Sequence, residues 1–202
     1  RNELFFFFFR ELKLISTIMA QLSDRLNRLA PSQTLAMSQK SNEMKAQGVD
    51  VINMSVGEPD FNTPEPIKEA AKKAIDDNFS RYSPVPGYAD LRKAIVAKLK
   101  KENNLDYTTD EVLVSNGAKQ SVCNTVMALV NDGEEVIIPA PYWVSYPQMV
   151  KLAGGTPVIV NAGFEQNFKM TPEQLEAAIT PKTRMLILCS PSNPTGSVYS
   201  KD

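Results

Sequence analysis

The sequence predicts an α/β fold built around a largely parallel sheet. Short runs of continuously apolar, β-branched residues alternate with longer stretches of helical periodicity. Such runs are typical of strands buried on both faces, as in a parallel sheet covered by helices. Hydrophobic residues make up 43% of the 202 and charged residues 22%, which is enough apolar material for a sizeable core. Antiparallel pairing of some strands stays open as an alternative.

The first half of the chain is predicted to hold one short strand between helices. The β-branched run 51–56 predicts the strand, and the turn-like stretch 57–64 follows it. Thr63 is a candidate N-cap, with Pro64 at the first helical position. Apolar residues at helical spacing then mark two helices, the first with Ile67, Ala71, Ala74 and Ile75, and the second with Tyr88, Leu91, Ile95 and Leu99.

The second half is predicted to hold four strands separated by helices. The expected strand ranges are 111–115, 135–138, 157–160 and 184–189. The first strand runs into the Asn116-Gly117 turn, and the helix after it carries Val122, Val126 and Val130 on one face. This alternation favours parallel strands joined by crossover helices.

The helix before the last strand has the clearest start signal. Thr171 and Gln174 have the spacing of a capping box, and Pro172 takes the first helical position. There is no internal repeat, and the only low-complexity segment is a run of phenylalanine near the N-terminus.

Residues 1–18 differ from the rest of the chain. They include Phe5 to Phe9, but this apolar run is far too short to span a bilayer. They also lack the basic start and small-residue cleavage site of a signal peptide. From Met19 onward the sequence is ordinary. We therefore expect residues 1–18 to be an extension outside the fold, with an arm that packs on a partner as the alternative.

The composition excludes several classes of function. A net charge of −1 gives no broad basic surface for nucleic acid or for an acidic membrane. Because there is no histidine, the usual Ser-His-Asp and Cys-His hydrolases and most zinc sites are excluded. Two cysteines, Cys123 and Cys189, suggest a reducing compartment, with the cytoplasm as the default, and we expect both in the core.

A possible phosphate site lies in the stretch LVSNGAKQS, residues 113–121. It has the order strand, glycine turn and helix, and a helix start offers free N–H groups and the positive end of the helix dipole. Gly117, Ala118 and Lys119 would form this anion cradle. The alternative is an ordinary Asn-Gly turn with a helix cap. The pattern matches neither a P-loop nor a dinucleotide-binding fingerprint.

Two further candidates follow predicted strands. Trp143, the only tryptophan, comes after strand 135–138, where an indole can stack on a flat heteroaromatic ring. Asn193 lies in SPSNPTG after strand 184–189, and the proline that follows restricts its backbone. A packing tryptophan and a plain Asn-Pro turn are the alternatives. If all three strands share one sheet, the cradle, the ring and the amide lie along one edge of it.

Five blocks of the sequence, in order and in spacing, resemble class I aminotransferases, the fold-type I enzymes that use pyridoxal 5′-phosphate. The blocks are SVGEPDFNTP (55–64), YSPVPGYADLRKAI (82–95), SNGAKQS (115–121), PAPYWVSYPQMV (139–150) and SPSNPTG (190–196). The likeness runs from about Gln21 to Asp202 and is to the N-terminal half of these enzymes, the bacterial aspartate aminotransferases above all. It implies a three-layer α/β/α large domain, incomplete here, and a homodimer.

The resemblance implies a role for each matching residue. Gly117, Ala118 and Lys119 would hold the cofactor phosphate through backbone amides. Trp143 would stack on the pyridine ring, and Asn193 would donate to its phenolic oxygen. The backbone N–H of Gly57 would bind the substrate carboxylate, and Tyr82 would reach the cofactor phosphate of a partner subunit. Trp143 and Asn193 would also contact the substrate. The peptide bonds Asn193-Pro194 and Ala140-Pro141 are expected to be cis.

The resemblance also implies an organisation and a gap. Residues 19–65 would form an N-terminal arm and part of a small domain, and residues 66–202 the first portion of the cofactor-binding large domain. The lysine that bonds covalently to the cofactor lies further along in the family, as does the arginine that selects the substrate, so we assign no catalytic residue here. Lys119 does not take that role.

The implied activity is transfer of an amino group from an amino acid to a 2-oxo acid by a ping-pong route. A chain without the covalent lysine is expected to be inactive alone. Two alternatives remain: an aminotransferase of the same family for aromatic or alanine-type substrates, and a non-catalytic α/β fragment.

Overall fold

The computed structural model describes residues 22–55 and 57–201, and the chain divides into two compact units. Unit 1 comprises the described residues of Arg1–Ser32 and of Cys123–Asp202, and unit 2 those of Gln33–Val122. The expectation for residues 1–18 lies outside the described residues.

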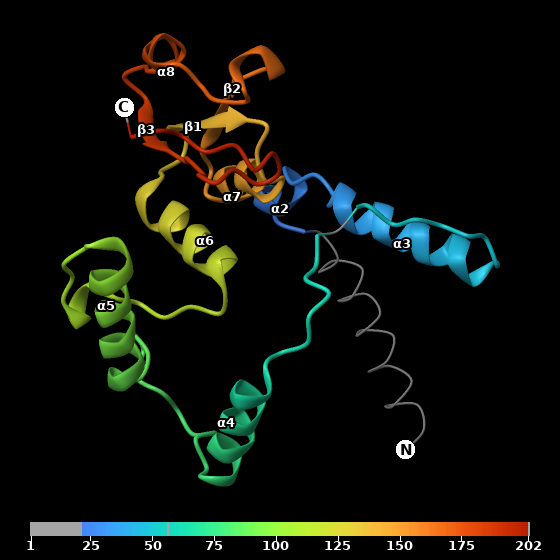
Figure 1. Ribbon diagram of the computed structural model, residues 1–202. Coiled ribbons are helices and arrows are strands. Elements are labelled where there is room, and N and C mark those ends of the chain that lie inside the picture. Colours follow the sequence, from blue (N-terminus) through green and yellow to red (C-terminus); the bar gives the residue numbers. More distant parts are fainter. Residues whose placement is uncertain (1–21, 56, 202) are drawn as a thin grey trace, which may run out of the picture. The chain divides into compact units, whose positions relative to one another are not determined.

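Unit 1 contains a parallel three-stranded sheet (Figure 1). Its strands are β1 (Glu135–Ala140), β2 (Thr156–Asn161) and β3 (Thr183–Leu186), in the order β2-β1-β3. In register, Ile137 of β1 lies opposite Val158 on one side and Leu186 on the other. The predicted parallel sheet is confirmed, and neither of the two strand pairs described is antiparallel.

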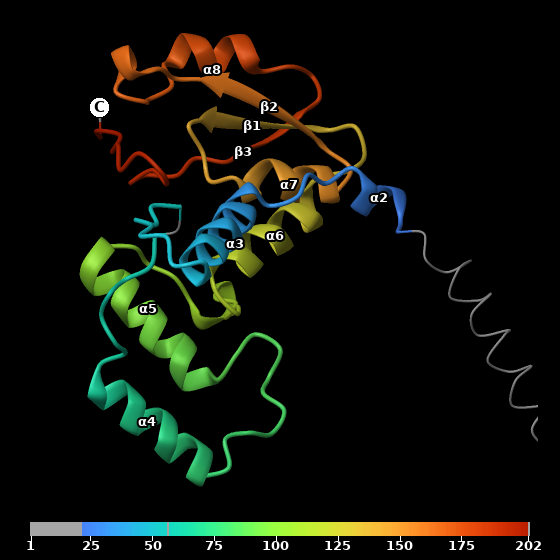
Figure 2. The same ribbon diagram turned by 90° about the vertical axis from the view of Figure 1, so that its right-hand side faces the viewer.

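The core of unit 1 is centred on β1. Val136, Ile137 and Ile138 are at most 1% exposed, and Val126 and Val150 are completely buried. The crossover helices α7 (Ser145–Leu152) and α8 (Pro172–Ala178) lie on opposite sides of the sheet (Figures 1 and 2). Right-handed crossovers require this, because β2 and β3 flank β1 on opposite sides. Unit 1 also contains two short elements, α2 (Asp24–Asn27) and the 3₁₀ helix η2 (Phe164–Gln166), and the part of α6 (Ala118–Leu129) from Cys123 onward.

The capping box of α8 forms as predicted. The Gln174 backbone N–H donates to Thr171 Oγ1 over 3.3 Å, and the Thr171 N–H donates to Gln174 Oε1 over 3.0 Å. Two hydrogen-bond donors at the helix start are thereby satisfied reciprocally. Pro172 is the first helical residue, as expected.

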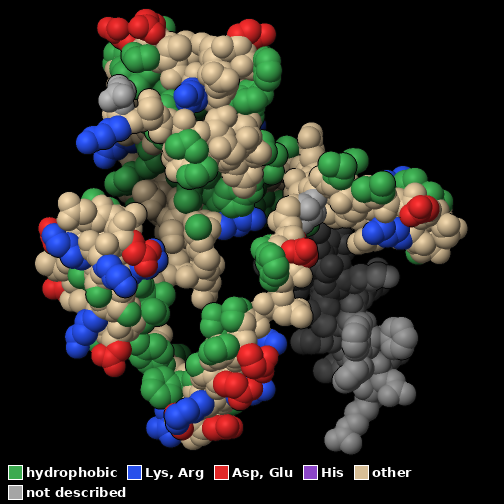
Figure 3. Space-filling model, in the orientation of Figure 1, with side chains coloured by type: hydrophobic (Ala, Val, Ile, Leu, Met, Phe, Trp, Pro, Cys, Tyr) green, Lys and Arg blue, Asp and Glu red, His purple; other side chains and the backbone are tan. Residues whose placement is uncertain are grey.

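Unit 2 is helical. It contains α3 (Gln33–Ala46), α4 (Glu65–Asp76), α5 (Ala89–Asn103), the 3₁₀ helix η1 (Thr109–Glu111) and the start of α6 (Ala118–Leu129). Acidic and basic side chains gather on α4 (Figure 3), where Lys68, Lys72 and Lys73 pair with carboxylates three or four residues away. The predicted apolar stripe of α4 is not buried within this unit, since Ile67 and Ile75 remain 58% and 72% exposed.

Three local predictions in unit 2 are wrong. The helix α4 begins at Glu65 with Pro64 as its N-cap, one residue later than the predicted cap at Thr63. Residues 51–55 form no strand, and Val56 lies outside the described residues. Residues 111–115 form no strand either: Glu111 ends η1, and Val114 donates only a loop hydrogen bond, to Pro86 O, over 3.1 Å. β-branched residues favour extended backbone, but a strand also needs a partner strand.

The two cysteines are less buried than expected. Cys123 and Cys189 are both half-buried and carry free thiols. Within residues 22–55 and 57–201, none of the helices combines the length and the apolar character that a membrane span needs.

The turn before β2 should be sensitive to substitution at Gly154. This glycine has φ +89°, and a Cβ atom here would overlap Asp132 Oδ1. We expect Gly154→Ala to lower the free energy of unfolding by about 2–4 kcal/mol, from left-handed strain plus displacement of Asp132. Urea denaturation measures the change.

Gly133→Ala is the matched control for that prediction. Gly133 also has a positive φ, +80°, but nothing lies within 4 Å of its Cβ position. It should therefore show the backbone strain alone, about 1–2 kcal/mol. Equal effects at the two glycines would contradict the contact with Asp132.

Candidate functional site: two loops at the carboxyl ends of the sheet

Trp143 lies in the turn that joins β1 to α7, beyond the carboxyl end of β1, as predicted. Its carbonyl oxygen accepts a hydrogen bond from the Tyr146 N–H over 3.0 Å. The rings of these two residues meet edge to face, with centroids 5.4 Å apart and planes at 89°. Since Trp143 is half-buried, the contact fixes the plane of the indole while part of the ring stays accessible.

Asn193 lies in the loop after β3, as predicted, and is exposed. Its loop closes on itself through two hydrogen bonds: Ser192 N–H to Ser197 O over 2.9 Å, and Gly196 N–H to Ser192 O over 2.8 Å. The expected cis bonds at Asn193-Pro194 and Ala140-Pro141 are both present, and Ser190-Pro191 is also cis.

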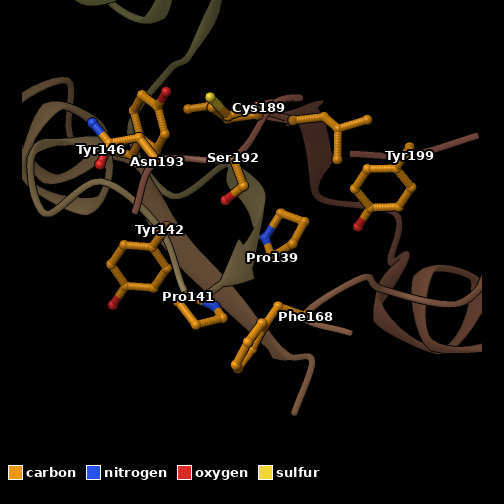
Figure 4. Close-up of a pocket in the computed structure, with 11 residues that line it drawn as sticks. Pro139, Pro141, Tyr142, Tyr146, Phe168, Cys189, Ser192, Asn193 and Tyr199 are labelled. Atoms are coloured by element: carbon orange, nitrogen blue, oxygen red, sulfur yellow. The ribbon is translucent and has the colours of Figure 1, made fainter. Parts of the chain in front are cut away.

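A pocket with an empty volume of about 320 Å³, part of it open to solvent, lies between these loops (Figure 4). Tyr142, Tyr146, Phe168 and Tyr199 supply aromatic walls, and Asn193 lies on its rim. The other residues that line it are Pro139, Pro141, Ile187, Leu188, Cys189 and Ser192. Tyr146 therefore connects the two predicted residues, because it contacts Trp143 and shares the pocket with Asn193.

The hydroxyl of Tyr146 resists ionisation. Its pKa is raised above the ordinary value of 10.0, first by burial and then by a hydrogen bond with the thiol of Cys189. Because the folded state holds this phenol neutral, its contribution to stability is present below pH 10.0, the ordinary pKa, and is lost as the pH rises above it.

We expect Tyr146→Phe to remove the tyrosine component that ionises at the highest pH. The measurement is the tyrosinate absorbance of the folded chain against pH, compared with the same titration in denaturant. If the high-pH part of the absorbance titration were unchanged in the variant, this would contradict the burial of the hydroxyl.

Five of the predicted site residues belong to unit 2. Gly117 has φ +83°, with nothing within 4 Å of its Cβ position, so the space beside its backbone is open. Its N–H donates to Ser115 O over 2.8 Å, and Ala118 and Lys119 follow as the first residues of α6. The first N–H groups of a helix have no acceptor within the helix. Gly57 is exposed, and the Tyr82 side chain is completely exposed.

The expectation of three strand ends along one sheet edge is corrected. The carboxyl ends of β1 and β3 carry Trp143 and Asn193, as predicted. The segment before Gly117 is not a strand, so the cradle does not follow a strand of this sheet. Tyr146 and Tyr199 were missed, although Tyr146 stands three residues after Trp143, a spacing that places two side chains on one side of a helical turn.

Comparison with known proteins decides the family. Residues 49–202 match the family described as aminotransferase class I and II. The chain belongs to this family. It is 57% identical over 182 residues to a probable aspartate/prephenate aminotransferase of Rickettsia bellii, and 57% identical over 183 residues to the aspartate/prephenate aminotransferase of Cereibacter sphaeroides. These matches cover 90% and 91% of this chain and 46% of each relative.

Solved structures agree with this assignment. The aspartate aminotransferase of Rhizobium meliloti matches with a TM-score of 0.85 at 44% identity, over 89% of this chain and 45% of that one. The Thermus thermophilus aspartate aminotransferase with maleate matches with a TM-score of 0.86 at 45% identity, over 90% and 47%. The α/β aminotransferase fold predicted from the sequence is therefore confirmed. The chain spans about half the length of the relatives that it matches.

Proposed function

We propose that this chain forms the cofactor-binding part of an aspartate aminotransferase-like enzyme that uses pyridoxal 5′-phosphate. The observation that carries the proposal is the family match over residues 49–202, together with Trp143 and Asn193 at the ends of neighbouring strands. Residues 66–202 would be the first portion of the large, cofactor-binding domain, and residues 19–65 an N-terminal arm and part of the small domain.

The residues present fit such a cofactor. The half-buried indole of Trp143, held by Tyr146, offers a face for a pyridine ring. The exposed amide of Asn193 offers a donor to the phenolic oxygen of that ring. At the start of α6, the open space beside Gly117 and the N–H groups of Ala118 and Lys119 suit a phosphate.

In this proposal the chain binds and orients rather than transfers protons. When bound, pyridoxal phosphate supplies the carbonyl group and the electron-withdrawing ring on which amino-group transfer depends. Trp143 would offer its face to the ring, Asn193 would donate to the phenolic oxygen of the ring, and both would also contact the substrate. Gly57 offers its N–H to the substrate carboxylate. We assign no catalytic acid, base or nucleophile to any residue of the chain.

The substrates we propose are aspartate as amino donor and a 2-oxo acid as acceptor. Prephenate is a specific acceptor candidate, because both relatives at 57% identity are named aspartate/prephenate aminotransferases. The fully exposed Tyr82 is proposed to reach the cofactor phosphate of a partner subunit in a homodimer. We propose the cytoplasm as its location.

A hybrid enzyme tests this function. It joins the chain to the part of the Cereibacter sphaeroides relative that lies beyond the matched residues. We expect the hybrid, supplied with pyridoxal phosphate, to convert prephenate to its amino acid with aspartate as donor. The measurement is product formation by chromatography, with aromatic amino acids and alanine as rival donors.

Two measurements make the result decisive. Circular dichroism and size-exclusion chromatography establish whether the hybrid folds and dimerises, and the parent enzyme provides the reference rate. Because the substrate-selecting arginine of the hybrid comes from the relative, the rival donors check only that the donor preference of the hybrid matches that of the parent enzyme. A folded hybrid that transfers no amino group contradicts the proposal and favours a non-catalytic α/β chain.

A further inference from the structure

The direction of the Asn193 amide depends on how its loop is held at the base. The two hydrogen bonds that close the loop, from Ser192 to Ser197 and from Gly196 to Ser192, lie within the loop itself. The Ser197 N–H adds a third internal bond, to Thr195 Oγ1 over 3.2 Å. These bonds fix the shape of the loop, but they leave its orientation on the sheet to contacts at the base.

Tyr199 makes those contacts. Its backbone N–H donates to Ser190 Oγ over 3.1 Å, which ties the two ends of the loop together. Its hydroxyl oxygen accepts a hydrogen bond from the Met170 N–H over 2.7 Å. Met170 is only 9% exposed and lies just before α8, so the tyrosine joins the loop to the folded body of unit 1.

Packing restricts the Tyr199 ring as well. The ring is half-buried and lines the same pocket as Phe168 and Ser192, with Asn193 on the rim (Figure 4). A ring held by a wall on one side and by a hydrogen bond at its tip has little freedom to rotate. The residue therefore holds the loop from three directions: the backbone, the ring and the hydroxyl.

We propose that Tyr199 is a positioning residue for Asn193. It acts through the loop and does not itself touch the cofactor. The proposal rests on the proposed function, because the direction of the Asn193 amide matters only if the amide donates a hydrogen bond to a cofactor ring. Ser190 is the second part of the same clamp, since its hydroxyl accepts the hydrogen bond that closes the base.

Removing the Tyr199 hydroxyl should release the loop while leaving the ring packed. Tyr199→Phe deprives the Met170 N–H of its acceptor, and an unpaired donor in a buried segment is unfavourable. We expect the affinity of the full 202-residue chain for pyridoxamine 5′-phosphate to fall about tenfold. This probe carries an amine and so does not condense with surface lysines, as pyridoxal phosphate would.

The test combines NMR with binding on the full chain. In ¹⁵N-labelled protein, Tyr199→Phe should speed hydrogen exchange at the Met170 and Gly196 amides and shift the side-chain NH₂ signals of Asn193. Tyr107→Phe is the matched control, because Tyr107 lies outside this pocket and no hydrogen bond of its hydroxyl is seen within the described residues. The control should change neither measurement.

Each outcome decides one question. Faster exchange at Met170 with unchanged Asn193 signals and unchanged affinity would overturn the positioning role and leave a structural one. If Tyr199→Phe does not fold, Ser190→Ala opens the base from the other side and should shift the same Asn193 signals; unchanged signals would overturn the proposal. If the unchanged chain does not bind pyridoxamine phosphate, the proposed function fails, and the NMR signals alone decide whether Tyr199 orients the loop.

Discussion

A chain in which Asn193 is replaced by alanine is expected to bind pyridoxamine 5′-phosphate about 10- to 100-fold more weakly than the unchanged chain. The reason is the loss of one hydrogen bond to a charged oxygen, which is worth about 1.5–3 kcal/mol. The side chain is exposed, so its removal leaves no cavity and should not change the stability of the fold. Isothermal titration calorimetry measures the affinity.

Two comparisons make that result specific. Asn193→Asp keeps the shape of the side chain but replaces its N–H donor with a negative oxygen, so it should bind more weakly than the alanine variant. Asn124→Ala, at an exposed position on α6, is the control and should bind like the unchanged chain. Equal affinity of all three variants would contradict the role of the Asn193 amide.

Replacing Trp143 by alanine is expected to weaken binding of the same ligand about tenfold or more. The variant removes the face on which the pyridine ring is proposed to stack, a contact worth about 0.5–1.5 kcal/mol beyond the apolar area that it buries. It also removes the edge-to-face contact with Tyr146, so the neighbouring ring loses its partner. Calorimetry is again the measurement, since this variant contains no tryptophan.

Trp143→Phe separates stacking from simple loss of volume. Phenylalanine keeps an aromatic face of smaller area, so its affinity should lie between those of the unchanged chain and the alanine variant. A phenylalanine variant as weak as the alanine variant would point to a role other than stacking. Thermal unfolding of both variants checks that the turn between β1 and α7 still forms.

The elements that were predicted correctly are those specified by residues close together in the sequence. The runs 136–138 and 157–160 are apolar without interruption because β1 lies at the centre of the sheet and β2 is contacted by α7 and α8. Thr171 and Gln174 specify the start of α8 because both partners of the capping box lie within one helical turn. The runs 51–56 and 111–115 have the same residue types, but strand formation also needs a neighbouring strand, which a local pattern does not reveal.

The residues of the site also differ in whether the sequence alone could predict them. Trp143 and Asn193 were predictable because each follows an apolar strand, and strand ends are where α/β folds place such residues. Tyr199 was not predictable, because its hydroxyl partner at Met170 is 29 residues away in the sequence. The contact of Tyr146 with Cys189 likewise joins α7 to the segment that follows β3, and it is visible only in the folded structure. Residues that hold a site in place depend on such long-range contacts.

The most direct measurement is the fluorescence of Trp143 as pyridoxamine 5′-phosphate is added to the folded 202-residue chain. The chain has a single tryptophan, so the signal reports on this one position. A ring stacked on the indole should quench its emission in a saturable way, and Asn193→Ala should shift that curve to higher ligand concentration. Emission that falls only in proportion to added ligand, or equally in the Asn193→Ala chain, would contradict a cofactor site built on Trp143 and Asn193.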